Sequence, residues 1–263
     1  QLLNQTMVYC DIVDVAADRG ERQLVKPRTG NFEAYQLYLK GRYFANQYFS
    51  NQRKGAGLAK ALECFQQALA LDERIALAHA GVAEVYTLLA FLGLRPPKEV
   101  LPDAKAAAQR ALAINDALAE AHTSLGFIHL AYEWDWPAAE RELQRAIALN
   151  PRFVLARYWY AMLCASRLRL DESVTEDERA VEVEPMSSFA NTHLGWMLLD
   201  AGRTARAIEQ LGKAIVLDPE FALAHWLLGC AHGSEARHEA ALPELETAVE
   251  LSNRLPWMVA ALA

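Results

Sequence analysis

The chain has 263 residues, of which 53% are hydrophobic and 22% are charged, and its formal net charge is −7 at pH 7. This composition is ample for a folded core. Acids and bases are interspersed, which disfavours the concentrated basic surface that direct nucleic-acid binding needs, and no apolar run approaches the length needed to cross a bilayer.

Residues 1–33 precede the repeated part of the chain. The stretch from Leu3 to Ala17 carries aliphatic residues on one side of an expected helix and is followed by a connector. The end repeat of a solenoid exposes its apolar side unless something covers it. We therefore expect residues 1–33 to form a capping helix and connector. The chain begins at Gln1 rather than Met, which suggests a fragment or a processed product.

One pattern recurs from residue 34 onward. Each unit has an alanine that is followed three positions later by an aliphatic residue and preceded seven positions earlier by Ala or Ser. These offsets place the residues on one helical face. The six alanines, at successive spacings of 43, 35, 34, 34 and 34 residues, are Ala68, Ala111, Ala146, Ala180, Ala214 and Ala248. Helices are expected to end at Asn150-Pro151, Glu184-Pro185 and Asp218-Pro219, because proline cannot continue a helix.

The first helix of each unit has its own signature. Ala-His pairs recur at 78–79, 121–122 and 224–225, and Leu-Gly pairs recur at 125–126, 194–195 and 228–229. We expect the glycine to lie where the two helices of a hairpin touch. Gly202 fits the left-handed position that ends a first helix.

The pattern predicts six helical hairpins followed by the start of a further or capping helix. The predicted ranges are 34–75, 76–118, 119–153, 154–187, 188–221 and 222–255, with 256–263 as the final segment. A 34-residue period favours a solenoid over an ordinary helical bundle, which has no reason to keep one.

Two units carry extra residues, around 46–57 in the first and around 91–99 in the second. These insertions either extend a lip of the groove or form longer helices with a solvent loop. In the second unit, Pro96-Pro97 should end the first helix, and Pro102 should open the second.

The third unit has one extra residue at its turn. We expect Asp135 to cap the second helix with Pro137 in its first turn, and Trp134 and Trp136 to pack the turn against a neighbour. In the fourth unit Asp177 stands where other units have a large apolar residue, or Ala108 in the second. Either that helix is rotated or a polar partner reaches Asp177, because an unpaired buried carboxylate is costly.

The recurring positions of the units, called columns below, resemble those of the tetratricopeptide repeat, and the fifth unit shows them most fully. They are Gly195, Ala207, Leu211, Ala214 and Pro219. The resemblance implies an all-α fold, a right-handed α-solenoid whose first helices line a concave groove, and a role in binding other proteins.

Three stretches resemble, more specifically, the C-terminal repeat array of bacterial multidomain signalling proteins. They are EAYQLYLKGRY at 33–43, AEAHTSLG at 119–126 and WDW at 134–136. In those proteins the array follows a winged-helix DNA-binding, nucleotide-cyclase or Ser/Thr kinase domain. The resemblance implies a part in signalling or transcription regulation, with the effector domain outside this sequence.

No catalytic constellation is found. Phosphate-binding glycine loops and the G-x-S-x-G motif are absent. His122 and His129, like His225 and His232, are seven residues apart, about 10 Å of helical rise, which is too far for one metal ion. Cys10, Cys64, Cys164 and Cys230 form no C-x-x-C pair. We therefore expect no catalytic residue, no cofactor and no metal. Free buried thiols favour a reducing compartment, so the expected localisation is cytoplasmic, or periplasmic if the parent protein is membrane-anchored.

The groove positions, transferred by register from the family, are largely apolar and aromatic. The family's chaperone-binding members grip a terminal carboxylate with Lys and Asn at such positions, and those residues are missing here. Aromatic residues and Met in a concavity are typical anchors for a partner helix or strand. The predicted partner-binding residues are Phe127, Tyr158, Met162, Phe189, Trp196 and Trp226.

The predicted function is a non-enzymatic protein-interaction module that binds an apolar peptide or partner domain in this groove, within a larger bacterial regulator. Two alternatives stay open. Trp196 and Trp226 could instead pack between repeats, and the array could be a homo-oligomerisation or scaffolding arm that pairs through the groove or the C-terminal end.

Overall fold

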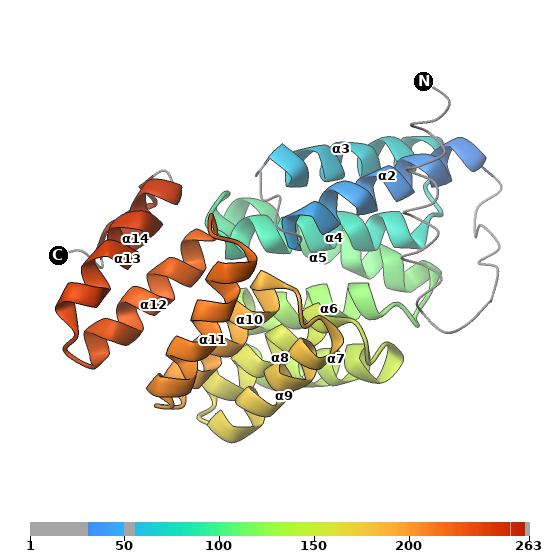
Figure 1. Ribbon diagram of the computed structural model, residues 1–263. Helices are drawn as coiled ribbons and strands as arrows, with labels where there is room; N and C mark the ends of the chain where they lie inside the picture. Colours follow the sequence, from blue (N-terminus) through green and yellow to red (C-terminus); the bar gives the residue numbers. More distant parts are fainter. Residues whose placement is uncertain (1–30, 50–55, 253, 261–263) are drawn as a thin grey trace.

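The computed structural model describes residues 31–49, 56–252 and 254–260, and these residues form a stack of helical hairpins (Figure 1). The expected capping helix in residues 1–33 lies almost wholly outside the described residues. Six antiparallel helix pairs follow one another along the chain, which confirms the predicted all-α solenoid. The first helices are α2 (Phe32–Phe49), α4 (Ala76–Phe91), α6 (Ala119–Ile128), α8 (Val154–Ser166), α10 (Ser188–Asp200) and α12 (Ala222–Ser234).

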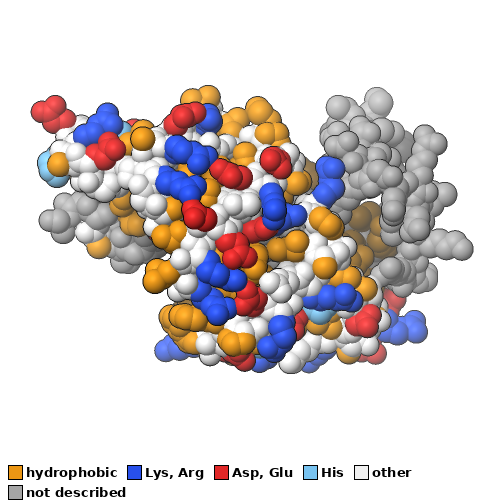
Figure 2. Space-filling view, turned by 90° about the horizontal axis from the view of Figure 1, so that it is seen from below, with side chains coloured by type: hydrophobic (Ala, Val, Ile, Leu, Met, Phe, Trp, Pro, Cys, Tyr) orange, Lys and Arg blue, Asp and Glu red, His pale blue; other side chains and the backbone are white. Residues whose placement is uncertain are grey.

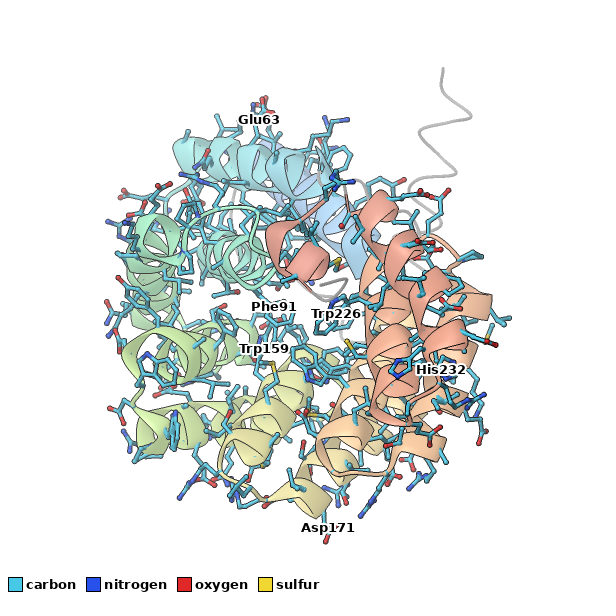
Figure 3. The ribbon with its side chains drawn as sticks, turned by 90° about the vertical axis from the view of Figure 1, so that its left-hand side faces the viewer. Glu63, Phe91, Trp159, Asp171, Trp226 and His232 are labelled. Carbon is cyan, nitrogen blue, oxygen red and sulfur yellow. The ribbon has the colours of Figure 1, made fainter. Side chains whose placement is uncertain are left out.

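The second helices complete the pairs and are followed by one short helix. They are α3 (Ala56–Leu71), α5 (Pro97–Ile114), α7 (Trp136–Leu149), α9 (Leu170–Val183), α11 (Thr204–Leu217) and α13 (His238–Leu251), and the chain then enters α14 (Pro256–Val259). Each first helix from α2 to α10 packs against the next first helix as well as against its own partner. The hairpins therefore succeed one another around a central region, toward which Phe91, Trp159 and Trp226 point (Figure 3).

The glycine column fixes how closely the two helices of a hairpin approach. A Cβ atom added at Gly126 would lie 2.5 Å from Cγ of Leu143, and one at Gly195 would lie 2.6 Å from Cγ of Leu211. Leu143 and Leu211 are fully buried. The leucine of the second helix thus fills the space that the glycine leaves, which confirms the predicted place of this column.

The second hairpin differs from the prediction at one boundary. Pro96-Pro97 does separate the two helices, but α5 begins at Pro97 and Pro102 lies inside it rather than at its start. Val100 and Leu101 are each 1% exposed. The free energy gained by burying Val100 and Leu101 favours a helix that begins more than a turn before Pro102. It offsets the loss of the backbone hydrogen bond that Pro102 cannot donate. The extra residues near 91–99 thus mainly lengthen helices. Those near 46–57 extend α2 to Phe49, and residues 50–55 lie outside the described residues.

The extra residue of the third hairpin is absorbed by a π-helical turn, η1 (His129–Glu133), which continues α6. Such turns accommodate a single inserted residue inside an α-helix. Asp135 then caps α7, because its carboxylate accepts a hydrogen bond from the Ala138 N–H at 3.0 Å, as predicted. Trp136 is half-buried, but Trp134 is 72% exposed and does not pack the turn as expected.

Candidate functional site

The inner face of the solenoid is built by the first helices, and its middle is an aromatic cluster. Phe91 of α4, Phe127 of α6 and Trp159 of α8 meet there. The Phe91 and Trp159 ring centroids are 4.8 Å apart, and those of Phe127 and Trp159 are 4.6 Å apart. Trp159 is fully buried. The cluster therefore joins three hairpins and belongs to the core.

Three of the predicted partner-binding residues are also core residues. Phe127, Tyr158 and Phe189 are 3%, 1% and 2% exposed, and the rings of Tyr158 and Phe189 lie 5.1 Å apart. Their helix register is the predicted one, but the neighbouring first helices approach so closely that these side chains fill the space between them. The structure thus removes them from the surface that a partner could contact without displacing the core.

The other three predicted residues, Met162, Trp196 and Trp226, are half-buried and share neighbours. Met162 and Trp196 pack against the same buried cluster around Ala161 and Leu198. Trp196 and Trp226 pack against a second one that includes Leu211. Met162, Trp196 and Trp226, on α8, α10 and α12, are called the apolar strip below. The strip packs between hairpins, as the alternative interpretation of the tryptophans held, and it also keeps accessible surface.

The C-terminal helix lies against one end of the apolar strip. Met258 of α14 is 3% exposed and joins a cluster with Ala248, Val249 and the half-buried Trp226. Helix α14 thereby covers part of the last hairpin, so the described end of the chain is partly capped.

Asp177 has a polar partner from the next hairpin. His193 Nδ1 lies 2.6 Å from Asp177 Oδ2, and the two side chains are 2% and 0% exposed. Burial raises the pKa of the Asp177 carboxyl, and His193 opposes that rise. Of the two explanations for the charge at this position, the structure supports the polar partner. Sequence periodicity gave no sign of it, because His193 shares no column with the other histidines.

The recurrent histidines of the third and sixth hairpins belong to a polar clamp that joins the two helices of a hairpin. His225 Nε2 lies 2.9 Å from the Pro219 carbonyl oxygen, and its Nδ1 lies 2.6 Å from Glu244 Oε2 on the second helix. His122 makes the same two contacts, with the Asp116 carbonyl and Glu142. These histidines are therefore used structurally.

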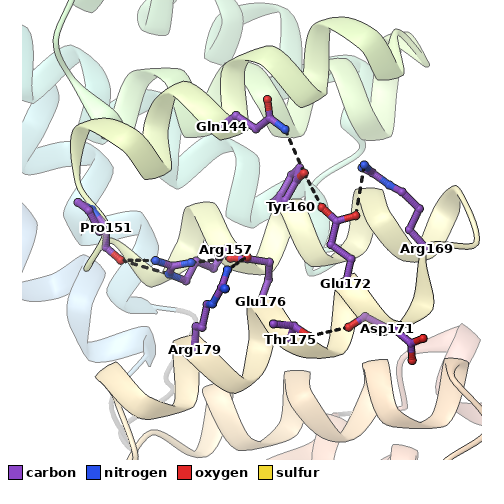
Figure 4. A network of polar contacts seen from close by, with 10 residues as sticks. All are labelled: Gln144, Pro151, Arg157, Tyr160, Arg169, Asp171, Glu172, Thr175, Glu176 and Arg179. Carbon is purple, nitrogen blue, oxygen red and sulfur yellow. Dashed lines mark hydrogen bonds and ion pairs between the residues drawn. The ribbon is translucent and has the colours of Figure 1, made fainter.

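Other residue types do the same in the fourth and fifth hairpins. Arg157 donates to the Pro151 carbonyl and to Glu176 (Figure 4). Asn191 donates to the Pro185 carbonyl and accepts from Gln210. The clamp position lies six residues after its carbonyl and 19 or 20 before its side-chain partner. The sequence contains this spacing in four units, but the residue types differ from unit to unit, so no recurring residue marks it.

Ion pairs between neighbouring hairpins cover the outer surface. Lys105 pairs with Glu133 at 2.6 Å, and Arg206 with Glu178 at 2.8 Å. Basic and acidic side chains alternate over the face shown in Figure 2, without a region of a single sign. Pairs of this kind set the register of exposed elements more than they add stability.

Within the described residues, no group of three or more His, Cys, Asp or Glu is arranged to hold a metal ion. None of the helices that the structure describes has the length and apolar content required to span a bilayer.

Comparisons with known proteins agree with this architecture. A "TPR repeat" family model matches residues 195–234, and a "Tetratricopeptide repeat" model matches residues 127–188. A sequence search of curated proteins gave no significant match.

Solved structures with a similar fold come from varied proteins. The human IFIT1 dimer with m7Gppp-AAAA matches with a TM-score of 0.70 and 15% identity, over 82% of this chain and 50% of that one. PilW, a type IV pilus biogenesis factor, matches with a TM-score of 0.62 and 16% identity, over 89% of this chain and 100% of that one. A tetratricopeptide repeat protein from Parabacteroides merdae matches with a TM-score of 0.60 and 18% identity, over 98% and 94%. At these identities the likeness concerns the fold.

The recurring columns, the stacked hairpins with glycine–leucine contacts and the two family matches together show that this chain contains tetratricopeptide repeats.

Proposed function

We propose that this chain is a protein-interaction module that binds an apolar segment of a partner protein along the apolar strip. Tetratricopeptide arrays support a role in protein–protein interaction in general. The observation that carries the finer proposal is that Met162, Trp196 and Trp226 keep accessible surface on three consecutive first helices. Large amphipathic rings and the adaptable Met side chain are favoured anchors at interfaces.

The proposed role is non-enzymatic, because the groups that chemistry would need are already used by the fold. His122, His193 and His225 are held in polar pairs. Burial raises the pKa of the Cys164 thiol to about 12, which keeps it protonated and poorly nucleophilic at neutral pH. The polar side chains of the inner helices thus support a binding scaffold.

The proposed setting is a larger bacterial regulator in the cytoplasm, in which this array senses or scaffolds for an effector domain. The support is the resemblance of residues 33–43, 119–126 and 134–136 to the repeat arrays of such regulators. Sequencing the gene upstream of the codon for Gln1 tests this setting. An effector domain there supports it, and an unrelated neighbouring gene contradicts it.

The binding proposal is tested by affinity capture from extract of the native organism, with the captured proteins quantified by mass spectrometry. The W196A/W226A variant should lose captured partners at least tenfold while its circular dichroism keeps the helical signal. The control is W134A, which removes an exposed tryptophan from a hairpin turn and should capture normally. Undiminished capture by folded W196A/W226A would overturn the proposal.

A further inference from the structure

The first helices carry several carboxylates, and one of them is balanced by an arginine. Arg42 of α2 lies 2.7 Å from Glu84 of α4, and the Glu84 side chain is only 3% exposed. Arg42 also donates to Asn46 at 3.3 Å. This arginine is therefore engaged by the fold, and it leaves no free positive charge for a partner carboxylate.

A second carboxylate, Glu120 of α6, stands near this pair and is half-buried. Burial raises the pKa of Tyr38, and the negative charges of Glu120 and Glu84 raise it further, while Arg42 lowers it. Glu120 therefore lies close enough to Tyr38 and Arg42 for its charge to act on both. Tyr35 lies beside Tyr38, with ring centroids 6.0 Å apart. Among the described residues Glu120 forms no ion pair within 4 Å, and Arg42, whose charge acts on it, is already paired with Glu84.

A third carboxylate lies at the apolar strip itself. Asp200 follows Trp196 by four residues on α10, so the two share a helical face. Asp200 is exposed, yet its carboxyl lies close enough to the protein for burial to raise its pKa, with His193 opposing the rise. No described cation pairs with it. An unpaired carboxylate thus adjoins a half-buried indole ring.

These charges restrict what can cover the strip. A purely apolar segment would take the Asp200 and Glu120 carboxylates out of water without a partner, which costs free energy. An acidic segment would add repulsion. A Lys or Arg would neutralise either carboxylate, and its cation could also lie over the neighbouring aromatic face.

We propose that the inner face binds a segment that is basic as well as apolar: its apolar side chains contact Met162 and Trp196, and a Lys or Arg pairs with Asp200 and a second with Glu120. This inference rests on the proposed function and deepens it by naming the class of partner. Asp200 lies two hairpins beyond Glu120, so the two basic residues are separated by the apolar part of the segment.

Selection from a phage-displayed library of random 12-residue peptides on the full chain tests the inference. Recovered peptides should be enriched in Lys and Arg over Asp and Glu, together with large apolar residues. Synthetic copies should bind the E120Q/D200N variant about two- to fivefold more weakly for each carboxylate removed. Their affinity for the wild type should fall as salt rises.

The matched control is E182Q/E246Q, which removes two exposed carboxylates from the outer helices α9 and α13 and changes the net charge equally. It should bind the peptides as the wild type does. Apolar peptides without a basic excess, or equal loss in both double variants, would overturn this inference while leaving the proposed function standing. Failure to recover any peptide that depends on Trp196 would contradict the proposed function itself.

Discussion

Asp177 shows how one residue changes the packing of a whole joint. Three hairpins pair a glycine on the first helix with a leucine on the second, and a Cβ on the glycine would lie 2.5–2.6 Å from that leucine. At the same two positions the fourth hairpin has Ala161 and Asp177. The extra methyl group takes the space of a leucine side chain, and the shorter aspartate fits instead. His193 from the next hairpin then supplies its partner.

Removing one member of the Asp177–His193 pair should lower the stability strongly. Replacing both of them together with Ala161 should not. D177L or H193L alone leaves a buried polar group unpaired, and each should lower the free energy of unfolding by about 3 kcal/mol. The D177L/H193L variant removes both polar groups but forces the new leucine against Ala161. We therefore expect A161G/D177L/H193L to lie within about 1 kcal/mol of the wild type or above it, measured by urea unfolding. A triple variant no more stable than D177L/H193L would contradict the steric account.

His122 and Glu142 give the hairpin clamp a pH dependence. Their hydrogen bond raises the pKa of His122 from 6.5 and lowers the pKa of Glu142 from 4.5. The His122 contribution to stability is full below pH 6.5 and is lost as pH rises through its raised pKa. The Glu142 contribution is full above pH 4.5 and is lost as pH falls through its lowered pKa.

The H122Q variant should therefore differ most from the wild type in melting temperature between pH 4.5 and pH 6.5. The difference should shrink toward pH 9 and toward pH 3. E142Q is the reciprocal control, because it removes the same bond from the other side. Thermal unfolding by circular dichroism across this range measures both. A difference that grows steadily above pH 7 would contradict the assignment.

From the second hairpin to the sixth, the turn between the two helices has one residue in the left-handed region, and the type of that residue varies. Leu168 and Gly202 both have left-handed backbones, with φ of 59° and 68°. In the second, fourth, fifth and sixth hairpins the turn closes in the same way, with a backbone N–H that donates to the carbonyl five residues earlier, for example from Arg169 to Cys164 at 2.8 Å. A helix end that is closed in this way needs a left-handed residue, and glycine adopts that conformation most easily. Leu168, which is 83% exposed, has no packing that offsets its backbone strain.

Substitution at this turn position should act through the backbone alone. L168G should raise the stability by about 0.5–1 kcal/mol, because glycine adopts the left-handed region without a steric cost. G202L should lower it by a similar amount. Differential scanning calorimetry of the two variants and the wild type measures the shifts. If L168G were destabilising, the leucine would have to hold contacts that the structure does not show.

The helix boundaries show what periodicity can and cannot predict. Proline placed the ends of α7, α9 and α11, because its effect on the backbone is local. The predicted start of α5 at Pro102 was wrong, because the burial of Val100 and Leu101 favours a helix that begins at Pro97. The π-helical turn at 129–133 accommodates one extra residue. Its only trace in the sequence is a spacing that is one residue longer than the repeat period, which does not predict a π-helix.

At the scale of the whole molecule, the predicted inner face mixed core and surface positions. The register placed Tyr158, Phe189 and Trp196 alike toward the groove. Tyr158 and Phe189 proved to fill the joint between neighbouring hairpins, whereas Trp196 keeps accessible surface. Which of them stays accessible depends on how closely successive first helices approach, a long-range property that one repeat does not encode. The pair of Asp177 and His193 was hidden for the same reason, since it joins two hairpins.

The stacking of hairpins makes the consequences of truncation local. Each hairpin contacts mainly its sequence neighbours, so stability is close to a sum of repeat and interface contributions. Met258 of α14 covers Val249 and the side of Trp226 at one end of this stack. Ending the chain after Ser252 removes that cover and exposes apolar surface of α12 and α13.

Hydrogen exchange followed by mass spectrometry should show faster exchange in 222–251 of the truncated chain and unchanged exchange in 76–149. Protection from exchange should fall only near the truncated end, because each hairpin packs mainly against its neighbours and the described contacts from α4 to α7 include no residue of α14. V259S, which weakens the same contact without shortening α14, should give a smaller change in the same region. A uniform rise in exchange from α4 to α13 would instead mean that the array unfolds as one cooperative unit, and its inner face would then depend on every hairpin at once.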